Sequence, residues 1–204
     1  MNDTDTLERV AAEVRGCTKC ALHKGRKNAV PGEGPANAQI MFIGEGPGFH
    51  ENEQGRPFVG AAGKFLEELL AGIGMSRDQV WIGNVVKCRP PGNRDPLPEE
   101  IQACGAYLDR QIALLDPKVI VTLGRYSMER YFPGAKISNV HGLPKRVGKR
   151  LVVAMFHPAA ALHQPSLRRT VEEDFKRLPQ MMAEADTTAE SGPEQPPAKQ
   201  LSMF

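Results

Sequence analysis

The chain has 204 residues, of which 41% are hydrophobic and 25% charged, and its net charge is +2. This composition fits one globular domain with a core of its own, followed by a tail. No apolar run approaches the roughly 20 residues that cross a bilayer, and the N-terminus lacks the features of a secretory signal, so we expect a cytoplasmic protein without a membrane partner.

The apolar periodicity predicts alternating helices and strands. In chain order it predicts a helix at 6–15, a buried strand at 39–44, a helix at 61–74, a strand at 80–86, a helix at 98–115, a strand at 118–124, a short helix at 125–132, an extended or hairpin segment at 135–147, a strand at 150–156 and a closing helix at 166–183.

Strands that alternate with helices indicate an α/β fold with a parallel sheet covered on both faces. In such sheets ligands bind at the carboxyl ends of the strands. The loops after Ile43, Val85, Leu123 and Phe156 should therefore meet at one cleft. We expect the domain to span residues 1–184 and a disordered tail to span 185–204.

The four cysteines form the next pattern. Cys17 and Cys20 make a C-x2-C pair, and Cys88 and Cys104 follow much later. In a cytosolic protein this spacing favours a metal site over disulfides. Four thiolates suit zinc or an iron–sulfur cluster equally well, and unrelated buried thiols are the third alternative.

A glycine-rich loop, GEGPGFHENEQGRPFVG at residues 44–60, follows the first predicted strand. Phe49 stands where a dinucleotide fingerprint needs glycine, and Phe65 where a P-loop needs Ser or Thr. The glutamates of this loop would also repel a phosphate. We therefore interpret it as a tight turn beside a neutral polar ligand, with a purely structural loop as the alternative.

Every charged residue from 130 to 171 is Lys or Arg, whereas acidic residues predominate after 172. This asymmetry indicates a basic surface for a polyanion, or else an ordinary solvated face.

Three motifs interleaved with the cysteines carry a family resemblance. GEGPGFHENEQGRPFVG, NVVKCRPPGNRDP and HPAAALHQ occur in this order. Together they resemble the family 4 uracil-DNA glycosylases, iron–sulfur enzymes of bacteria and archaea, over roughly residues 7–178. The resemblance implies an α/β/α sandwich around a four-stranded parallel sheet, with one four-iron, four-sulfur cluster bound by the cysteines.

The same resemblance implies an enzyme that flips uracil out of DNA and hydrolyses its N-glycosidic bond. The Asn84 amide would donate to uracil O4 and accept from N3–H, and Phe58 would stack on the ring. His157 and the backbone N–H of Gly46 match the donors that stabilise charge at uracil O2. As alternatives, Asn84 and Phe58 form a turn and part of the core, and His157 is structural.

Three further polar residues match the family's site. Glu45 is assigned to the attacking water, although the best-known branch of the superfamily uses aspartate. Glu51 should crowd the C5 edge of uracil and so exclude thymine. Asn93 matches an active-site position, with turn formation as the alternative.

Contacts with DNA are expected from the segment after the fourth strand. Leu162 would fill the space left by the flipped base, with His163 beside it, and Arg168 and Arg169 would contact phosphates.

The tail ends in QLSMF, an apolar end on a polar segment. Gln200, Leu201, Met203 and Phe204 resemble the short motif by which bacterial repair proteins dock on the sliding DNA clamp, with a frayed terminus as the alternative. We expect a monomer. Two other functions stay open, a non-catalytic iron–sulfur module that binds DNA and a zinc-stabilised hydrolase of a small nucleotide.

Overall fold

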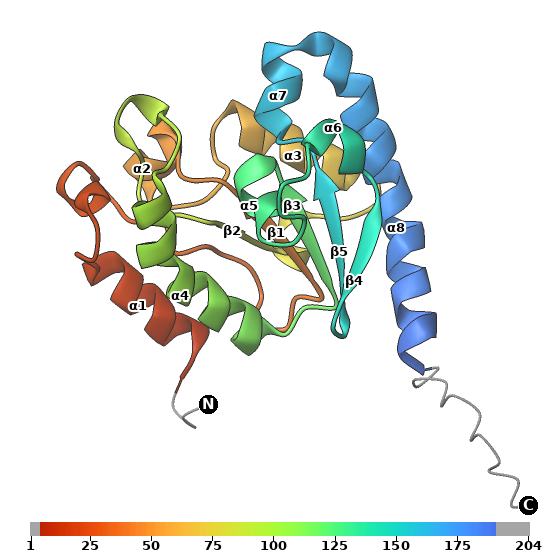
Figure 1. Ribbon diagram of the computed structural model, residues 1–204, viewed down its shortest axis with the longest axis horizontal. Helices are drawn as coiled ribbons and strands as arrows, with labels where there is room; N and C mark the ends of the chain where they lie inside the picture. The colour runs from red at the N-terminus through yellow and green to blue at the C-terminus, as the bar shows by residue number, and fades with distance from the viewer. Residues whose placement is uncertain (1–4, 191–204) are drawn as a thin grey trace, which may run out of the picture.

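The computed structural model describes residues 5–190, and within 185–190 it describes only the backbone of the last helix. Short 3-10 turns connect the main elements. In chain order, these elements are α1 (Leu7–Gly16), β1 (Ile40–Gly44), α2 (Phe49–Gln54), α3 (Ala61–Ala71), β2 (Trp81–Asn84), α4 (Pro98–Leu115), β3 (Val119–Leu123), α5 (Arg125–Glu129), α6 (Ile137–Val140), β4 (Pro144–Val147), β5 (Arg150–Met155), α7 (Pro158–His163) and α8 (Arg168–Glu190) (Figure 1).

The sheet has five strands in the order β2-β1-β3-β5-β4. β1 pairs in parallel with β2 and β3, and β3 pairs in parallel with β5, so the four predicted parallel strands are confirmed. β4 adds a fifth, antiparallel strand from the end of the segment 135–147, which was expected to be extended or a hairpin. The first part of that segment instead forms the short helix α6. Its two-residue turn has Gly148 at φ +59°, a backbone that suits the twist of a tight hairpin.

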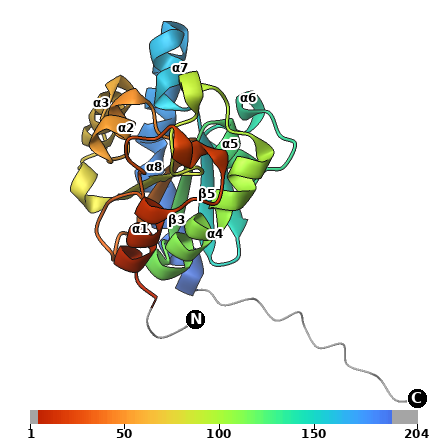
Figure 2. The same cartoon turned by 90° about the vertical axis from the view of Figure 1, so that its left-hand side faces the viewer.

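Successive residues of each strand point to opposite faces, and each face packs on its own set of helices. On one face Phe42 and Val121 pack with residues of α3 and α8. On the other, Met41 and Ile120 pack with residues of α1 and α4. The expected α/β/α sandwich is confirmed, and Figure 2 shows α1 and α4 together on their side of the sheet.

Two helices lie in segments that were expected to be loops. α2 lies within the glycine-rich loop, and Gly55 ends it in the left-handed conformation at φ +69°. α7 begins at Pro158, a favoured residue at the first helical position, and the side chain of His157 caps it. α8 runs to Glu190, beyond the predicted end at 183. Of these helices, α2 and α7 shape the rim of the cleft described below.

No helix among residues 5–190 has the length and apolarity needed to cross a membrane. The rest of the expected tail, with its terminal motif, lies outside the described residues.

Candidate active site

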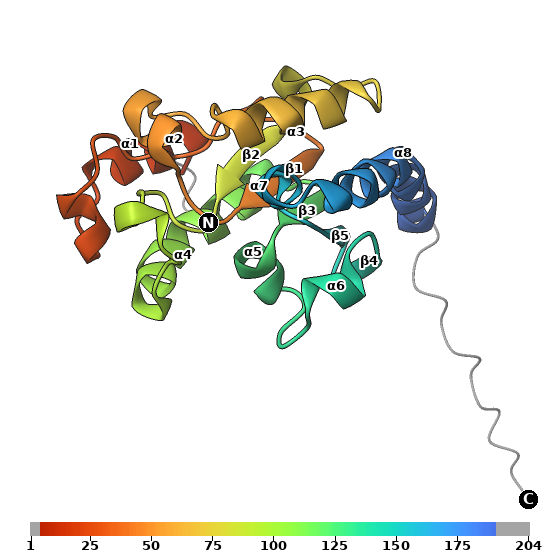
Figure 3. The ribbon, with the colours of Figure 1, turned by 90° about the horizontal axis from the view of Figure 1, so that it is seen from above.

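A cleft of about 540 Å³ opens at the carboxyl ends of the parallel strands. Figure 3 views the sheet and its covering helices from this side. Its size falls in the range of ligand pockets, about 300–1,000 Å³. The sequence-predicted residues that line it are Glu45, Gly46, Glu51, Phe58, Asn84, Asn93, His157 and His163. Segments after β1, β2 and β5 therefore meet as expected. The loop after β3 contributes indirectly, since Arg125 pairs with Asp95 of the cleft wall.

Asn84 ends β2 deep in the cleft, with 1% of its surface exposed. Its Oδ1 is buried and has no hydrogen-bond partner among the described residues. Buried polar atoms are nearly always paired, so an unpaired one that borders a cleft indicates a ligand donor. Beside it, a Cβ at Gly44 would collide with both Oδ1 of Asn84 and the Phe58 ring. Glycine at the end of β1 thus lets the amide and the ring come together.

Phe58 has a left-handed backbone at φ +52°, which is rare for a bulky residue. Its ring stacks on that of His157 with centroids 5.4 Å apart. Arg77 donates from Nη1 to the Phe58 carbonyl (2.7 Å) and from Nη2 to the Pro57 carbonyl. Glu33 in turn accepts from Nε of Arg77 at 2.8 Å. Such a conformation persists where the surroundings determine it from several sides.

Glu51 holds the same loop from α2. Its Oε1 accepts from the backbone N–H groups of Val59 (2.8 Å) and Gly60 (2.9 Å). This carboxylate therefore orders the chain that follows Phe58 as well as lining the cleft.

His157 is a neutral donor by geometry. The backbone N–H of Ala159 donates to its Nδ1 at 3.1 Å, so Nδ1 carries the lone pair and Nε2 carries the proton. Burial lowers the pKa of His157 to about 4, and the charge of Glu51 offsets this only in part. The imidazole is thus uncharged at neutral pH.

Glu45 is half-buried just after β1. Burial, and then the negative charge of Asp95, raise the pKa of its carboxyl, while Arg125 opposes the shift. A carboxylate poised in this way is suited to accept a hydrogen bond from water or a proton.

The opposite rim is built by the segment before α4. Asn93 has φ +56°, and its Oδ1 accepts from Nε of Arg89 at 2.7 Å. The Arg89 guanidinium lies over the ring of Phe49, which is 52% exposed. Arg94 lines the cleft and pairs twice with Glu100, at 2.9 and 2.7 Å, which ties this rim to α4.

The expected DNA-contacting residues lie on α7 (Leu162 and His163) and at the start of α8 (Arg168 and Arg169). Leu162 is 43% exposed, and His163 borders the cleft. Arg168 is paired with Glu68 and Glu172, both at 2.9 Å, and Arg169 with Glu173 at 2.7 Å. These exposed pairs would compete with a phosphate for both guanidinium groups.

The basic run between 130 and 171 does not form one surface at the cleft. Lys149 and Arg150 pair with Asp116 at the amino ends of the strands, opposite the cleft. Lys145 donates to the Tyr131 carbonyl at 2.7 Å.

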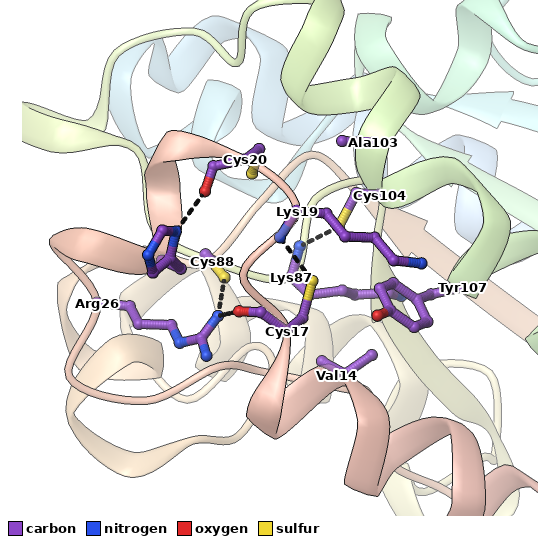
Figure 4. A pocket seen from close by; sticks show the side chains of 11 residues that line it. Val14, Cys17, Lys19, Cys20, Arg26, Lys87, Cys88, Ala103, Cys104 and Tyr107 are labelled. Atoms are coloured by element: carbon purple, nitrogen blue, oxygen red, sulfur yellow. Dashed lines mark hydrogen bonds between the residues drawn. The ribbon is translucent and has the colours of Figure 1, made fainter.

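The four cysteines line one cavity between α1, the following turn and α4 (Figure 4). Three of their sulfurs accept N–H groups: Sγ of Cys88 from Arg26 (3.2 Å), Sγ of Cys104 from the Lys87 backbone (3.3 Å) and Sγ of Cys17 from the Lys19 backbone (3.5 Å). The charged residues in the lining are all cations or histidine.

Such a donor set fits a metal–thiolate group, because N–H groups and cations stabilise thiolate sulfur. Burial raises the pKa of the Cys104 thiol to about 11, so metal binding would have to displace its proton. Within residues 5–190, no three His, Cys, Asp or Glu side chains are grouped so as to hold a single metal ion.

Sequence reasoning missed Arg77, Asp95 and Lys87. Asp95 stands in the quoted GNRDP motif and could have been found there. Arg77 and Lys87 act through backbone carbonyls, and residue type alone carries no signal for such partners.

The model of the uracil DNA glycosylase superfamily matches residues 31–179, and it defines the class to which this fold and cleft belong. The chain is similar to type-4 uracil-DNA glycosylases of Sulfurisphaera tokodaii (52% identity; 85% of this chain and 84% of the relative covered) and Archaeoglobus fulgidus (46%; 90% and 97%). A third relative, from Thermotoga maritima, is 47% identical over 85% of this chain and 93% of its own. The chain therefore belongs to the type-4 uracil-DNA glycosylases.

Arg77→Ala should loosen Phe58 and lower the rate of uracil release about 10- to 100-fold, since a bond to a charged donor contributes about 1.5–3 kcal/mol. Arg56→Ala is the matched control, because Arg56 binds the same Glu33 but is 56% exposed, against 16% for Arg77. Single-turnover kinetics with thermal unfolding measures both. Equal rates in the two variants would contradict the role of Arg77.

Proposed function

We propose that this protein flips uracil out of DNA into the cleft and hydrolyses its N-glycosidic bond, leaving an abasic site. The observation that carries the proposal is the buried, unpaired Oδ1 of Asn84 at the base of the cleft. Uracil supplies the missing donor at N3–H, and its O4 accepts from the same amide. Cytosine presents the reverse pattern at these atoms, so the amide selects uracil.

Phe58 and His157 complete the base pocket in this proposal. The Phe58 ring stacks on the pyrimidine, and its fixed backbone keeps it in place. Nε2–H of His157 and the backbone N–H of Gly46 stabilise the negative charge that develops at uracil O2. Removing one such donor typically costs about 100- to 1,000-fold in rate.

Glu45 positions the attacking water as the bond to the sugar breaks and the sugar gains oxocarbenium character. Glu51 excludes thymine by crowding the C5 edge, and its bonds to Val59 and Gly60 keep it in place. Asn93 lies across the cleft, where it contacts the flipped nucleotide.

Leu162 fills the gap left in the duplex, with His163 beside it, and Arg168 and Arg169 contact the flanking phosphates. The exposure of Leu162, next to His163 of the cleft lining, supports this assignment. The role requires partial unstacking of the neighbouring bases, which costs a few kcal/mol.

We also propose one four-iron, four-sulfur cluster in the cavity lined by Cys17, Cys20, Cys88 and Cys104. When bound, the cluster ties α1 and its following turn to α4. The residues of the chain contribute the N–H donors that stabilise its sulfurs, chiefly Arg26.

Three expectations remain predictions from the sequence. They are a monomeric state, a cytoplasmic location and docking on the sliding clamp through Gln200, Leu201, Met203 and Phe204.

Asn84→Ala should lower uracil release about 100-fold or more while leaving affinity for undamaged DNA unchanged, because Asn84 reads the base and not the backbone. Asn52→Ala is the control: it too is a buried asparagine, but its Oδ1 is already bonded to the Lys27 N–H at 2.9 Å. This variant should lose stability and keep its base selectivity. A base-release assay on oligonucleotides with uracil, cytosine or thymine measures both, and full activity in Asn84→Ala would overturn the assignment.

The rate should fall in acid as Glu45 takes up a proton, at a pH above the usual range of glutamate because its pKa is raised. Asp95→Asn removes a like charge and frees Arg125, so the fall should move to lower pH. Asp109→Asn, which breaks an exposed pair with Arg130, should leave it in place. Single-turnover rates from pH 4.5 to 8 provide the test, and a profile that Asp95→Asn does not move would remove Glu45 from this role.

Replacing Cys17 and Cys20 by Ala should abolish iron binding and lower the unfolding temperature together, since the cluster joins distant segments. Lys19→Ala keeps all four cysteines and should retain iron. Iron content, visible absorption and thermal unfolding measure the outcome. Colourless wild-type protein that contains zinc would exclude the cluster.

A further inference from the structure

Lys87 is a buried charge to which the proposed mechanism gives no role. Its side chain is 1% exposed, between β2 and the cavity of the cysteines. Nζ donates to the backbone carbonyl of Asn84 at 2.9 Å and to Oε1 of Gln111 at 2.6 Å. Both partners are uncharged oxygens. A buried ammonium is costly to keep in such a place unless negative charge lies nearby.

The backbone of the same residue reaches the cysteine cavity. Its N–H donates to Sγ of Cys104 at 3.3 Å, and its carbonyl accepts from the Val30 N–H at 2.7 Å. Lys87 therefore touches a thiol through its main chain and the base-reading residue through its side chain. Figure 4 shows Lys87 beside Cys104 in this cavity.

The bond from Nζ of Lys87 satisfies the Asn84 carbonyl at the edge of the sheet, where no neighbouring strand of the described residues donates to it. β2 is an edge strand of the sheet, and Glu33 pairs with Ile82 in two backbone bonds of 2.8 and 2.9 Å. Further along β2, Nζ of Lys87 supplies the donor for the Asn84 carbonyl. Gln111 anchors Nζ from α4, since its own Nε2 donates to the Pro31 carbonyl at 2.7 Å. The end of β2 is thus fixed by an ammonium that α4 holds in place.

We propose that Lys87 is a positioning residue that couples the cysteine cavity to the Asn84 amide, with its ammonium serving as the counter-charge to the metal-bound thiolates. The inference rests on the proposed roles of Asn84 and of the cluster. Metal binding at Cys88 and Cys104 orders the backbone on both sides of Lys87. Through its Nζ bond, the ordered Lys87 then fixes the backbone of Asn84, whose side chain reads uracil in the proposed function.

A double-mutant cycle tests the link to Asn84. Lys87→Met should lower single-turnover uracil release about 10- to 100-fold, as expected for loss of a charge-assisted hydrogen bond of about 1.5–3 kcal/mol. Because Lys87 acts through Asn84, the variant with both Lys87→Met and Asn84→Ala should be no slower than Asn84→Ala alone. A double variant in which the rate losses of Lys87→Met and Asn84→Ala multiply would overturn the proposal, and so would a wild-type rate in Lys87→Met.

Lys145→Met is the matched control, because Nζ of Lys145 also binds a backbone carbonyl but lies away from the cleft. Its rate should equal that of the wild type. If Lys87→Met fails to fold, Gln111→Met removes the second anchor of Nζ while leaving the ammonium. Gln111→Met should lower the single-turnover rate less than Lys87→Met does, and its effect should also be non-additive with that of Asn84→Ala. Additive effects of Gln111→Met and Asn84→Ala would count against the link between Lys87 and Asn84.

A redox titration of the purified holoprotein tests whether the Lys87 ammonium acts as a counter-charge to the metal-bound thiolates. Removing a positive charge next to the cluster disfavours an added electron, so the midpoint potential of Lys87→Met should be more negative than that of the wild type at equal iron content. An unchanged midpoint potential would overturn the role of Lys87 as a counter-charge. Failure of the wild type to release uracil would overturn the proposed function itself, and wild-type protein without iron would overturn the cluster. In the latter case the kinetic cycle alone decides the link between Lys87 and Asn84.

Discussion

The parallel pairing of β1 with both β2 and β3 is the constraint on which the cleft depends. In this register Gly44 lies opposite Asn84, so the amide meets a backbone without a side chain. β5 runs parallel on the other side of β3 and brings His157 to the same edge. The Asn84 amide and the His157 imidazole, which come from distant parts of the sequence, therefore converge because the strand ends coincide. The sheet thus sets the arrangement of these two groups.

Bonds that originate outside the cleft hold its side chains in place. Arg77 fixes the strained backbone of Phe58 from the far side, and Glu51 fixes the residues that follow it. Ala159 sets the tautomer of His157. In a preorganised site of this kind, groups need not move as charge develops, which is the main source of electrostatic catalysis. The cost is local strain, which the surrounding hydrogen bonds offset.

Much of this arrangement could be predicted from the sequence, because apolar periodicity and motif order are local signals. Apolar periodicity predicted the parallel strands and the covering helices, and the family resemblance carried by the three motifs implied most of the polar residues in the cleft. The β4 hairpin was predicted less specifically, as an extended or hairpin segment, although Gly148 marks its turn. Long-range partners leave no such signal. Lys149 was counted toward a basic surface, but Asp116 binds it at the other end of the sheet.

The charges of the cleft suit a neutral ligand that becomes negative only as it reacts. Glu45 and Glu51 disfavour a phosphate inside the cleft, so the DNA backbone is better accommodated at the rim, near His163. A permanently cationic histidine would attract any anion in the ground state. In the proposed mechanism, a neutral His157 binds uncharged uracil weakly, and its hydrogen bond strengthens as charge develops at uracil O2. Burial and the Ala159 bond, by keeping His157 neutral, thus direct its hydrogen bond to the transition state of the proposed reaction.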